Sequence, residues 1–410
     1  MSLLLFHDAA LLDPAAGELR PGCDVLVEGE RIAEVSERPI ASSAAERIEL
    51  RGATLMPGLI DAHVHAVITS MDLAAMERKP VTLVAHEARR VLEGMLQRGF
   101  TTVRDAGGAD WGLAQAVESG LVAGPRLFFS GRVLSQTGGH GDFRPRAESG
   151  SLCACQVHSS YFSHVADGVD AVRKAAREEL RRGAHQVKIM ASGGVASPTD
   201  PIWNLQYSEG EMTAIVEEAR GWRTYAMAHA YTPDAIARAV RAGVRTIEHG
   251  NLIDAASAAL VKERGAYLVP TLVTYFMIQK FGRALRFPEA SLRKVNDVLD
   301  AGLASLEIAK RAGVPMGFGT DLLGETHEHQ SREFGIRAKV LAPAEILRSA
   351  TVVNAEILGR PGELGVIAPG ALADLLVVDG NPLEDISLLE GQGEHLRAIL
   401  KGGRFYKNQL

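Results

Sequence analysis

The stretch that decides the fold is Met56-Pro57-Gly58-Leu59-Ile60-Asp61-Ala62-His63-Val64-His65. It opens with a Pro-Gly turn signal, continues as an apolar run and ends in two histidines. In a β-strand, side chains two positions apart point to the same face. His63 and His65 would therefore lie side by side at the end of a strand, as two ligands of one metal ion do. The alternative is an ordinary strand with two incidental histidines.

Beyond this stretch, strand-like runs alternate with segments of helical periodicity as far as residue 358. Each predicted helix ends near a glycine, and one begins with the capping-box pattern of Ser208 and Glu211. The alternation amounts to about eight β/α units and predicts an α/β fold, a (β/α)8 TIM-type barrel rather than a doubly wound sheet. The expected later strands cover residues 101–105, 126–130, 186–190, 224–229, 245–249, 266–271 and 314–321, and the expected helices cover residues 81–98, 166–182, 208–221, 232–243 and 289–312.

Both ends of the chain consist of short strands and turns, exemplified by the hairpin turn Glu28-Gly29-Glu30. Neither end has enough apolar surface to form a stable domain alone. We therefore expect residues 1–57 and 359–410 to pair into one small β-sandwich domain. Residues 58–358 would then form the barrel.

Composition excludes several classes of function. The 410 residues are 46% hydrophobic with a formal net charge of -6 and no run of basic residues, which argues against a nucleic-acid partner. No apolar stretch reaches the length of a membrane span, and the first residues lack the basic region of a signal peptide. We expect a cytoplasmic protein.

The cysteines are Cys23, Cys153 and Cys155, an odd and sparse set that does not suggest a disulfide framework. The Cys153-x-Cys155 pair could bind a metal ion. Nothing nearby in the sequence completes such a site, so we do not expect one there.

Polar residues that could bind a metal stand at the ends of five predicted strands. The residues are His63 and His65, Lys188, His229, His249, and Asp321. In barrel enzymes the C-terminal ends of the strands build the active site. Taken singly, a histidine after a strand is usually a loop residue and a lysine in an apolar strand often reaches out to solvent. Their coincidence favours one joint site.

With these residues the chain resembles the amidohydrolase superfamily, in its binuclear metal-dependent branch. The likeness runs nearly end to end and includes Pro57 to His65, the later histidines, Gly319-Thr320-Asp321 and the closing Gly370-Ala371-Leu372-Ala373-Asp374-Leu375. It implies two divalent ions, with zinc expected. His63, His65 and Asp321 would bind the more buried ion, His229 and His249 would bind the other, and a carboxylated Lys188 would bridge them.

The chemistry of these side chains agrees with the resemblance. Imidazole and carboxylate ligands suit zinc and its first-row neighbours. An ammonium group has no lone pair, so Lys188 is a sensible ligand only as a carbamate; the alternative is a simple salt bridge. Two ions lower the pKa of a shared water towards neutrality. Asp321 would take the proton of that nucleophile and return it to the leaving group.

The order of motifs resembles the Xaa-Pro dipeptidases (prolidases), related carboxypeptidases and imidazolonepropionase-like proteins. By that resemblance, His140 in Gln136-Thr137-Gly138-Gly139-His140-Gly141 and Tyr231 face the substrate. Either could stabilise the oxyanion or bind the substrate carboxylate. The alternatives are a loop histidine and a tyrosine packed on the barrel rim. His327, in a loop after Asp321, is a weaker candidate for substrate binding, as are Arg144 and Arg146.

These observations predict a binuclear metal-dependent hydrolase of C–N bonds, with Xaa-Pro dipeptides as the leading substrate and a homo-oligomer as the expected assembly. Dipeptides with other C-terminal residues, N-acyl amino acids, lactones and phosphoesters remain alternatives on the same metal pair. Deaminase chemistry is less expected, because relatives of that kind use one metal and lack the lysine. A scaffold without catalysis is the most remote alternative, because all six ligands are present.

Overall fold

The computed structural model describes residues 3–76, 78–144, 162–197 and 199–410. Arg146 and the Cys153-x-Cys155 pair, which the sequence raised as candidates, lie outside these residues. Cys23 is buried and free. No helix in the described ranges is long and apolar enough to cross a membrane.

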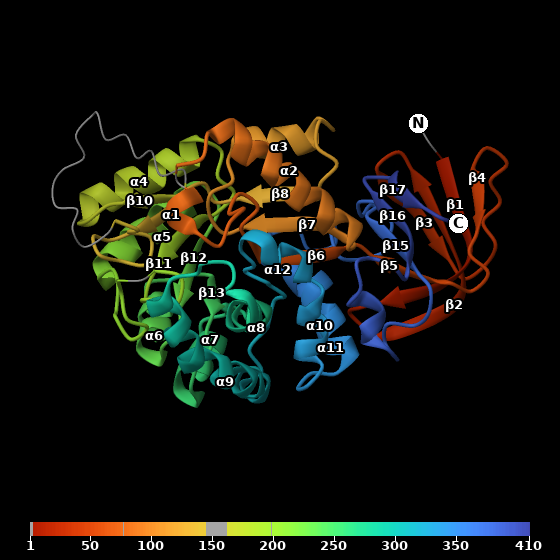
Figure 1. Ribbon diagram of the computed structural model, residues 1–410. Coiled ribbons are helices and arrows are strands. Elements are labelled where there is room, and N and C mark those ends of the chain that lie inside the picture. The colour runs from red at the N-terminus through yellow and green to blue at the C-terminus, as the bar shows by residue number, and fades with distance from the viewer. Residues whose placement is uncertain (1–2, 77, 145–161, 198) are drawn as a thin grey trace.

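Strands from both ends of the chain share one sheet (Figure 1). Within the described residues it has eight strands, in the order β17-β16-β15-β5-β1-β2-β3 with β4 on β1. In the central contact β15 runs antiparallel to β5, with Leu376 opposite Met56. The strands are β1 (Leu3–Asp13), β2 (Glu18–Glu28), β3 (Arg31–Ser36), β4 (Glu46–Glu49), β5 (Thr54–Pro57), β15 (Leu375–Val378), β16 (Leu396–Lys401) and β17 (Arg404–Asn408).

The pairing of the two ends follows from their apolar residues. Leu55 of β5, Leu375 of β15 and Leu400 of β16 belong to one buried cluster together with residues of β1 and β2. The expectation that both ends meet in one β-structure therefore agrees with the strand order. The division of these strands into two packed layers, and the exact domain limits, remain predictions.

Two parallel sheets make up the middle of the chain. The described strands form a three-stranded sheet β6-β7-β8 and a six-stranded sheet β10-β9-β11-β12-β13-β14. Every residue of β6, β7, β11, β12 and β13 is buried, as expected for parallel strands covered on both faces. The bounds are β6 (Leu59–Val64), β7 (Phe100–Asp105), β8 (Arg126–Phe129), β9 (Val133–Ser135), β10 (Ser163–Val165), β11 (Val187–Met190), β12 (Ala226–Ala230), β13 (Thr246–His249) and β14 (Tyr267–Val269).

Helices follow the strands along the chain and surround the parallel sheets (Figure 1). Ser208 caps its helix in a full capping box, and Thr232 caps a helix with Pro233 at its first position, as the sequence predicts. The helices are α1 (Leu73–Met76), α2 (Val81–Gln97), α3 (Trp111–Glu118), α4 (Val169–Arg181), α5 (Glu209–Gly221), α6 (Pro233–Arg241), α7 (Ala255–Glu263), α8 (Leu272–Phe281), α9 (Glu289–Ala312), α10 (Arg332–Arg337), α11 (Pro343–Arg348) and α12 (Asn354–Ile357). Short 3-10 helices are η1 (Gly324–His329) and η3 (Ile386–Leu389), and η2 (Ser349–Val353) is a short π-helix.

The strand predicted over residues 314–321 is not a regular strand. Its ladder is reduced to one parallel bridge between Met316 and Leu268. The backbone then bonds irregularly to β6, where the amide of Ala62 donates to the Phe318 carbonyl and the amide of Asp321 to that of His63. Asp321 has a left-handed backbone with φ of 53°, which ends any extended run there. This segment links β14 to β6.

Candidate metal and active site

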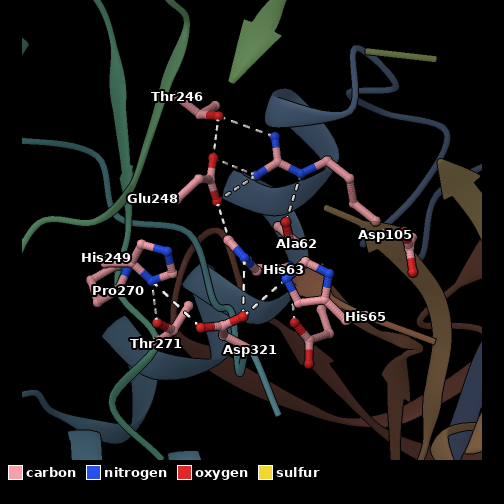
Figure 2. A network of polar contacts seen from close by, with 12 residues as sticks. Ala62, His63, His65, Asp105, Thr246, Glu248, His249, Pro270, Thr271 and Asp321 are labelled. Atoms are coloured by element: carbon pink, nitrogen blue, oxygen red, sulfur yellow. Dashed lines mark hydrogen bonds and ion pairs between the residues drawn. The ribbon is translucent and has the colours of Figure 1, made fainter. Parts of the chain in front are cut away.

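Four histidines, at or just after the ends of strands β6, β12 and β13, each have one ring nitrogen engaged by a fixed partner. His63 Nδ1 lies 2.7 Å from Glu248 Oε2 (Figure 2), and His65 Nδ1 lies 3.1 Å from the Gly107 carbonyl. A carboxylate or carbonyl oxygen only accepts, so the nitrogen facing it carries the hydrogen. The second nitrogen is left with its lone pair, the state that metal-binding histidines require.

The other two histidines follow the same pattern. His229 Nε2 faces the Gly193 carbonyl at 3.2 Å, and His249 Nδ1 lies 2.8 Å from the Thr271 hydroxyl. Burial is the main cause that lowers the pKa of both imidazoles well below the ordinary value. They are therefore neutral and able to act as ligands.

The free Nε2 atoms of His63 and His65 converge on Asp321. His63 Nε2 is buried and has no hydrogen bond to any described residue, although Asp321 Oδ1 lies 3.4 Å away. The same oxygen lies 3.1 Å from His65 Nε2, and His249 belongs to the compact group formed by His63 and Asp321. An unpaired buried lone pair beside a carboxylate is costly unless a cation satisfies it. The donor set therefore fits a divalent ion.

Glu248 supplies the charge behind this group. It is fully buried, and Arg104 donates to both its oxygens at 3.0 and 3.1 Å. Burial alone would raise its pKa, but Arg104 and His63 lower that pKa to about 2. A permanently charged Glu248 holds the His63 ring in one tautomer and orientation.

Lys188 lies on β11 and is buried, and it lines one cavity together with the four histidines and Asp321. Burial lowers the pKa of its amine to about 8, against the opposing charges of Glu248 and Asp321. About a tenth of the amine is then unprotonated at pH 7, far more than for an ordinary lysine. Only the unprotonated amine can attack carbon dioxide, so this environment suits carbamate formation.

His140 stacks on His229 with ring centroids 4.4 Å apart. Its Nδ1 lies 3.2 Å from Asp200 Oδ2, a carboxylate that also accepts from the Gly194 amide. Gly194 packs so closely that a Cβ atom there would lie 2.5 Å from His140 Nε2 and 2.6 Å from His229 Nε2. The loop after β11 therefore fixes both imidazoles.

Tyr231 follows β12 and stacks on His249, with ring centroids 5.3 Å apart. Its hydroxyl lies 2.8 Å from that of Tyr275. Burial is the largest of the causes that raise the pKa of both phenols above the ordinary value. Both hydroxyls therefore keep their protons and are able to donate hydrogen bonds.

One cavity brings together the predicted residues. His63, His65, Lys188, His229, His249, Asp321, His140 and Tyr231 all line it. Its remaining walls are mainly apolar, formed by Ile68, Leu73, Phe143, Phe162, Met190, Val195, Ile278 and Leu323. These eight residues are the ones that the sequence predicted for the site, and Thr274 and Tyr275 line the cavity in addition.

Two of the weaker candidates, His327 and Arg144, are not among the residues that line this cavity. His327 Nε2 lies 2.9 Å from the Ile68 carbonyl, and burial lowers the pKa of His327 to about 4. This residue is not among those that line the cavity, so its role in substrate binding stays a prediction. Arg144 pairs with Asp142 through two short contacts.

Several polar residues of the site were not anticipated. Glu248 had a signal, since an acidic residue within the buried four-residue strand β13 needs a charged or hydrogen-bonding partner. Asp200, Thr271 and Tyr275 had none, because they reach the site from loops and a helix whose positions depend on the folded chain.

Comparisons with known proteins agree with this geometry. The sequence model of the amidohydrolase family matches residues 54–404. A crystal structure of a prolidase complexed with N-methylphosphonate-L-proline is 54% identical, covers 100% of both chains and has a TM-score of 0.97. A Xaa-Pro dipeptidase crystallised with methionine in its active site is 31% identical, covers 99% of this chain and 100% of that chain, and has a TM-score of 0.88. An ochratoxinase from Aspergillus niger is 32% identical over 97% of this chain and 86% of its own length.

Proposed function

The chain belongs to the amidohydrolase family, and we propose that it is a metal-dependent hydrolase that cleaves the peptide bond of Xaa-Pro dipeptides. The observation that carries this proposal is the single cavity lined by the six metal-binding candidates together with His140 and Tyr231. The likeness to a prolidase that binds a proline phosphonate supports the choice of substrate.

In this proposal His63, His65 and Asp321 would hold one divalent ion and His229 and His249 the other, and a carboxylated Lys188 would complete the set of ligands. Zinc is the expected metal. Ions held there act as Lewis acids towards water and the scissile carbonyl.

The side chains of the site have separate tasks. Asp321 accepts a proton on its carboxylate when water attacks, and returns it to the proline nitrogen as the bond breaks. That nitrogen carries no hydrogen in the peptide bond, so it cannot leave as an amine unless it is protonated. The protonated phenol of Tyr231 and the imidazole of His140 stabilise the oxyanion or bind the carboxylate, with the division between them left open.

The apolar walls favour a substrate whose leaving group is a hydrocarbon ring. Ile68, Val195 and Ile278 offer the kind of surface against which a pyrrolidine ring loses its hydration. A second candidate is the hydrolysis of other dipeptides or N-acyl amino acids. The 32% identity to an ochratoxinase, whose name gives a substrate other than an Xaa-Pro dipeptide, is the observation that favours a wider range of substrates.

The finer description of the fold belongs to the same proposal. We infer that the two parallel sheets and the segment of residues 314–321 form one (β/α)8 barrel over residues 58–358. The hydrogen bond from the His185 amide to the Phe129 carbonyl, at the end of β8, supports this closure. Residues 1–57 and 359–410 would form the β-sandwich domain.

The test is kcat/KM of the zinc-loaded protein, with bicarbonate, across dipeptides ending in proline, arginine, lysine or leucine and across N-acyl amino acids. We expect a strong preference for C-terminal proline and about two equivalents of bound metal. Lys188→Ala should abolish activity, with partial rescue by short carboxylic acids, whereas the exposed lysine variant Lys262→Ala should behave as wild type. Full activity of Lys188→Ala would refute the mechanism, and absence of metal would favour a scaffold.

A further inference from the structure

Two residues outside the predicted set connect His249 with Tyr231. Thr271 Oγ1 lies 2.8 Å from His249 Nδ1, and the Thr271 hydroxyl lies close enough to Tyr275 to lower the pKa of that phenol against the larger effect of burial. Tyr275, on α8, places its hydroxyl 2.8 Å from that of Tyr231. All four side chains are buried. They form a row that leads from the imidazole of His249, a candidate metal ligand, to the phenol of Tyr231 in the cavity.

The chemistry at one end fixes the direction of this chain. His249 Nδ1 faces Asp321 Oδ2 at 3.8 Å as well as Thr271 (Figure 2). A nitrogen beside a carboxylate keeps its hydrogen, and a metal on Nε2 requires the same tautomer. Nδ1–H then donates to the Thr271 oxygen, and the Thr271 hydroxyl is left to donate to Tyr275.

The same reasoning applies to the hydroxyl groups of Tyr275 and Tyr231. Once Tyr275 accepts from Thr271, its own hydroxyl hydrogen is available for the Tyr231 oxygen. Tyr231 accepts that bond, so its hydrogen is directed away from Tyr275, towards the cavity. In the reverse direction Tyr231 would donate to Tyr275 and present only lone pairs to the substrate.

We propose that Thr271 and Tyr275 are positioning residues that turn the Tyr231 hydroxyl hydrogen towards the substrate, with the tautomer of His249 setting the direction. This inference rests on the proposed function. The carboxylate and the developing oxyanion of the proposed substrate are both negative, and only a donor stabilises them. Tyr275 and Thr271 act through Tyr231 and do not touch the substrate themselves.

A double-mutant cycle on kcat/KM for alanyl-proline tests the link between the two phenols. Tyr231→Phe should lower kcat/KM by about 100-fold, the usual loss for one oxyanion donor, and Tyr275→Phe by about tenfold. The double variant should be no slower than Tyr231→Phe alone, because Tyr275 acts only through Tyr231. Independent roles would instead multiply to about 1000-fold, which would overturn the proposal.

Metal binding provides a readout that does not depend on activity. Thr271→Val removes the partner of His249 Nδ1 and should weaken Zn²⁺ binding at one of the two sites by about tenfold, as loss of such partners does. Competition with a chromogenic chelator measures this affinity. Thr271→Ser should restore it, and Tyr275→Phe should leave it unchanged. Wild-type zinc affinity in Thr271→Val would refute the coupling to His249.

Tyr207→Phe is the matched control. Tyr207 is also buried, but its hydroxyl has no hydrogen-bond partner among the described residues, so the variant should keep wild-type kinetics and metal affinity. If the wild-type protein binds zinc but cleaves no dipeptide, the proposed function fails and the metal arm still decides the coupling. If it cleaves alanyl-proline and the cycle is multiplicative, only this inference fails.

Discussion

Gly194 is the residue at which the backbone comes closest to the imidazoles of the site. A Cβ atom there would lie 2.4 to 2.6 Å from ring atoms of His140 and His229, well inside van der Waals contact. The absence of a side chain lets the loop pack directly on both rings. The loop therefore defines where each imidazole can point.

We expect Gly194→Ala to displace His140 and His229 and to lower kcat/KM by about 100-fold, since a shift of about 1 Å in a catalytic group can cost that much. Gly221→Ala is the control. A Cβ at Gly221, the last residue of α5, meets nothing within 4 Å, so this change should leave kinetics intact. It should raise stability by up to about 0.5–1 kcal/mol. Wild-type kinetics of Gly194→Ala would show that the rings tolerate movement.

At the level of single residues, the sequence predicted which side chains meet but not what holds them. His63 and His65 were recognisable from their spacing in one strand, whose alternation is a local property. Their supports were not, because Glu248 reaches His63 from a strand 185 residues away in sequence. Such contacts depend on tertiary structure, and the same holds for Asp200 at His140.

Among the elements, the loop after β11 is held by the first turns of α9. Lys294 donates to the carbonyls of Gly194, Ser197 and Asp200 at 2.7, 2.5 and 2.5 Å. One helix side chain thus satisfies three loop carbonyls and lies behind the carboxylate that orients His140. The rigidity of the site depends on this contact between a helix and a loop.

Lys294→Met keeps the length of the side chain and removes its three donors. A buried carbonyl without a hydrogen-bond partner costs about 1–3 kcal/mol, and we expect a loss of stability of about that size in total. We also expect faster amide exchange in the loop and a reduced kcat/KM. Urea unfolding measures the loss of stability, and hydrogen exchange measures the faster amide exchange in the loop. Lys310→Met, on the same helix, loses only an exposed pair with Glu345 and should change stability by less than about 1 kcal/mol. Equal exchange rates in both variants would contradict the anchoring role.

Regular elements were predictable where their signals are local. The limits of α9 and the caps of α5 and α6 follow from nearby residues, and the structure confirms them. The predicted strand over residues 314–321 was wrong as a regular element. Its apolar pattern is strand-like, but Asp321 adopts a left-handed backbone in order to face His63 and His65, and no local signal announces that demand.

On the scale of the whole molecule, Asp374 joins the sheet of the two chain ends to the parallel strands. Its Oδ2 accepts from Arg126 of β8 at 2.6 Å, and its Oδ1 accepts from the Gly402 amide at 2.8 Å. Its carbonyl accepts from the Gly58 amide, just before β6. The closing motif around Asp374 therefore has a structural role distant from the cavity.

We expect Asp374→Asn to lower the free energy of unfolding by about 1–3 kcal/mol, because Arg126 loses its charged partner. Zinc content and kcat/KM should stay within about twofold of wild type. Chemical denaturation and metal analysis are the measurements. Asp379→Asn alters an exposed carboxylate close to β15 and should remain within about 0.5 kcal/mol of wild type. A loss of metal in Asp374→Asn would mean that the contacts of Asp374 also determine the geometry of the candidate metal site.

The pairing of β5 with β15 also has a consequence for how the protein is made. The two strands are about 320 residues apart, and a ribosome adds roughly 5–20 residues per second. For roughly 15 s to a minute during each round of translation, the nascent chain therefore presents the open edge of β5 and the apolar face of its neighbours. Strand β5 finds its partner only after residues 58–374 have been synthesised, so this sheet cannot close before residues 375–378 have left the ribosome.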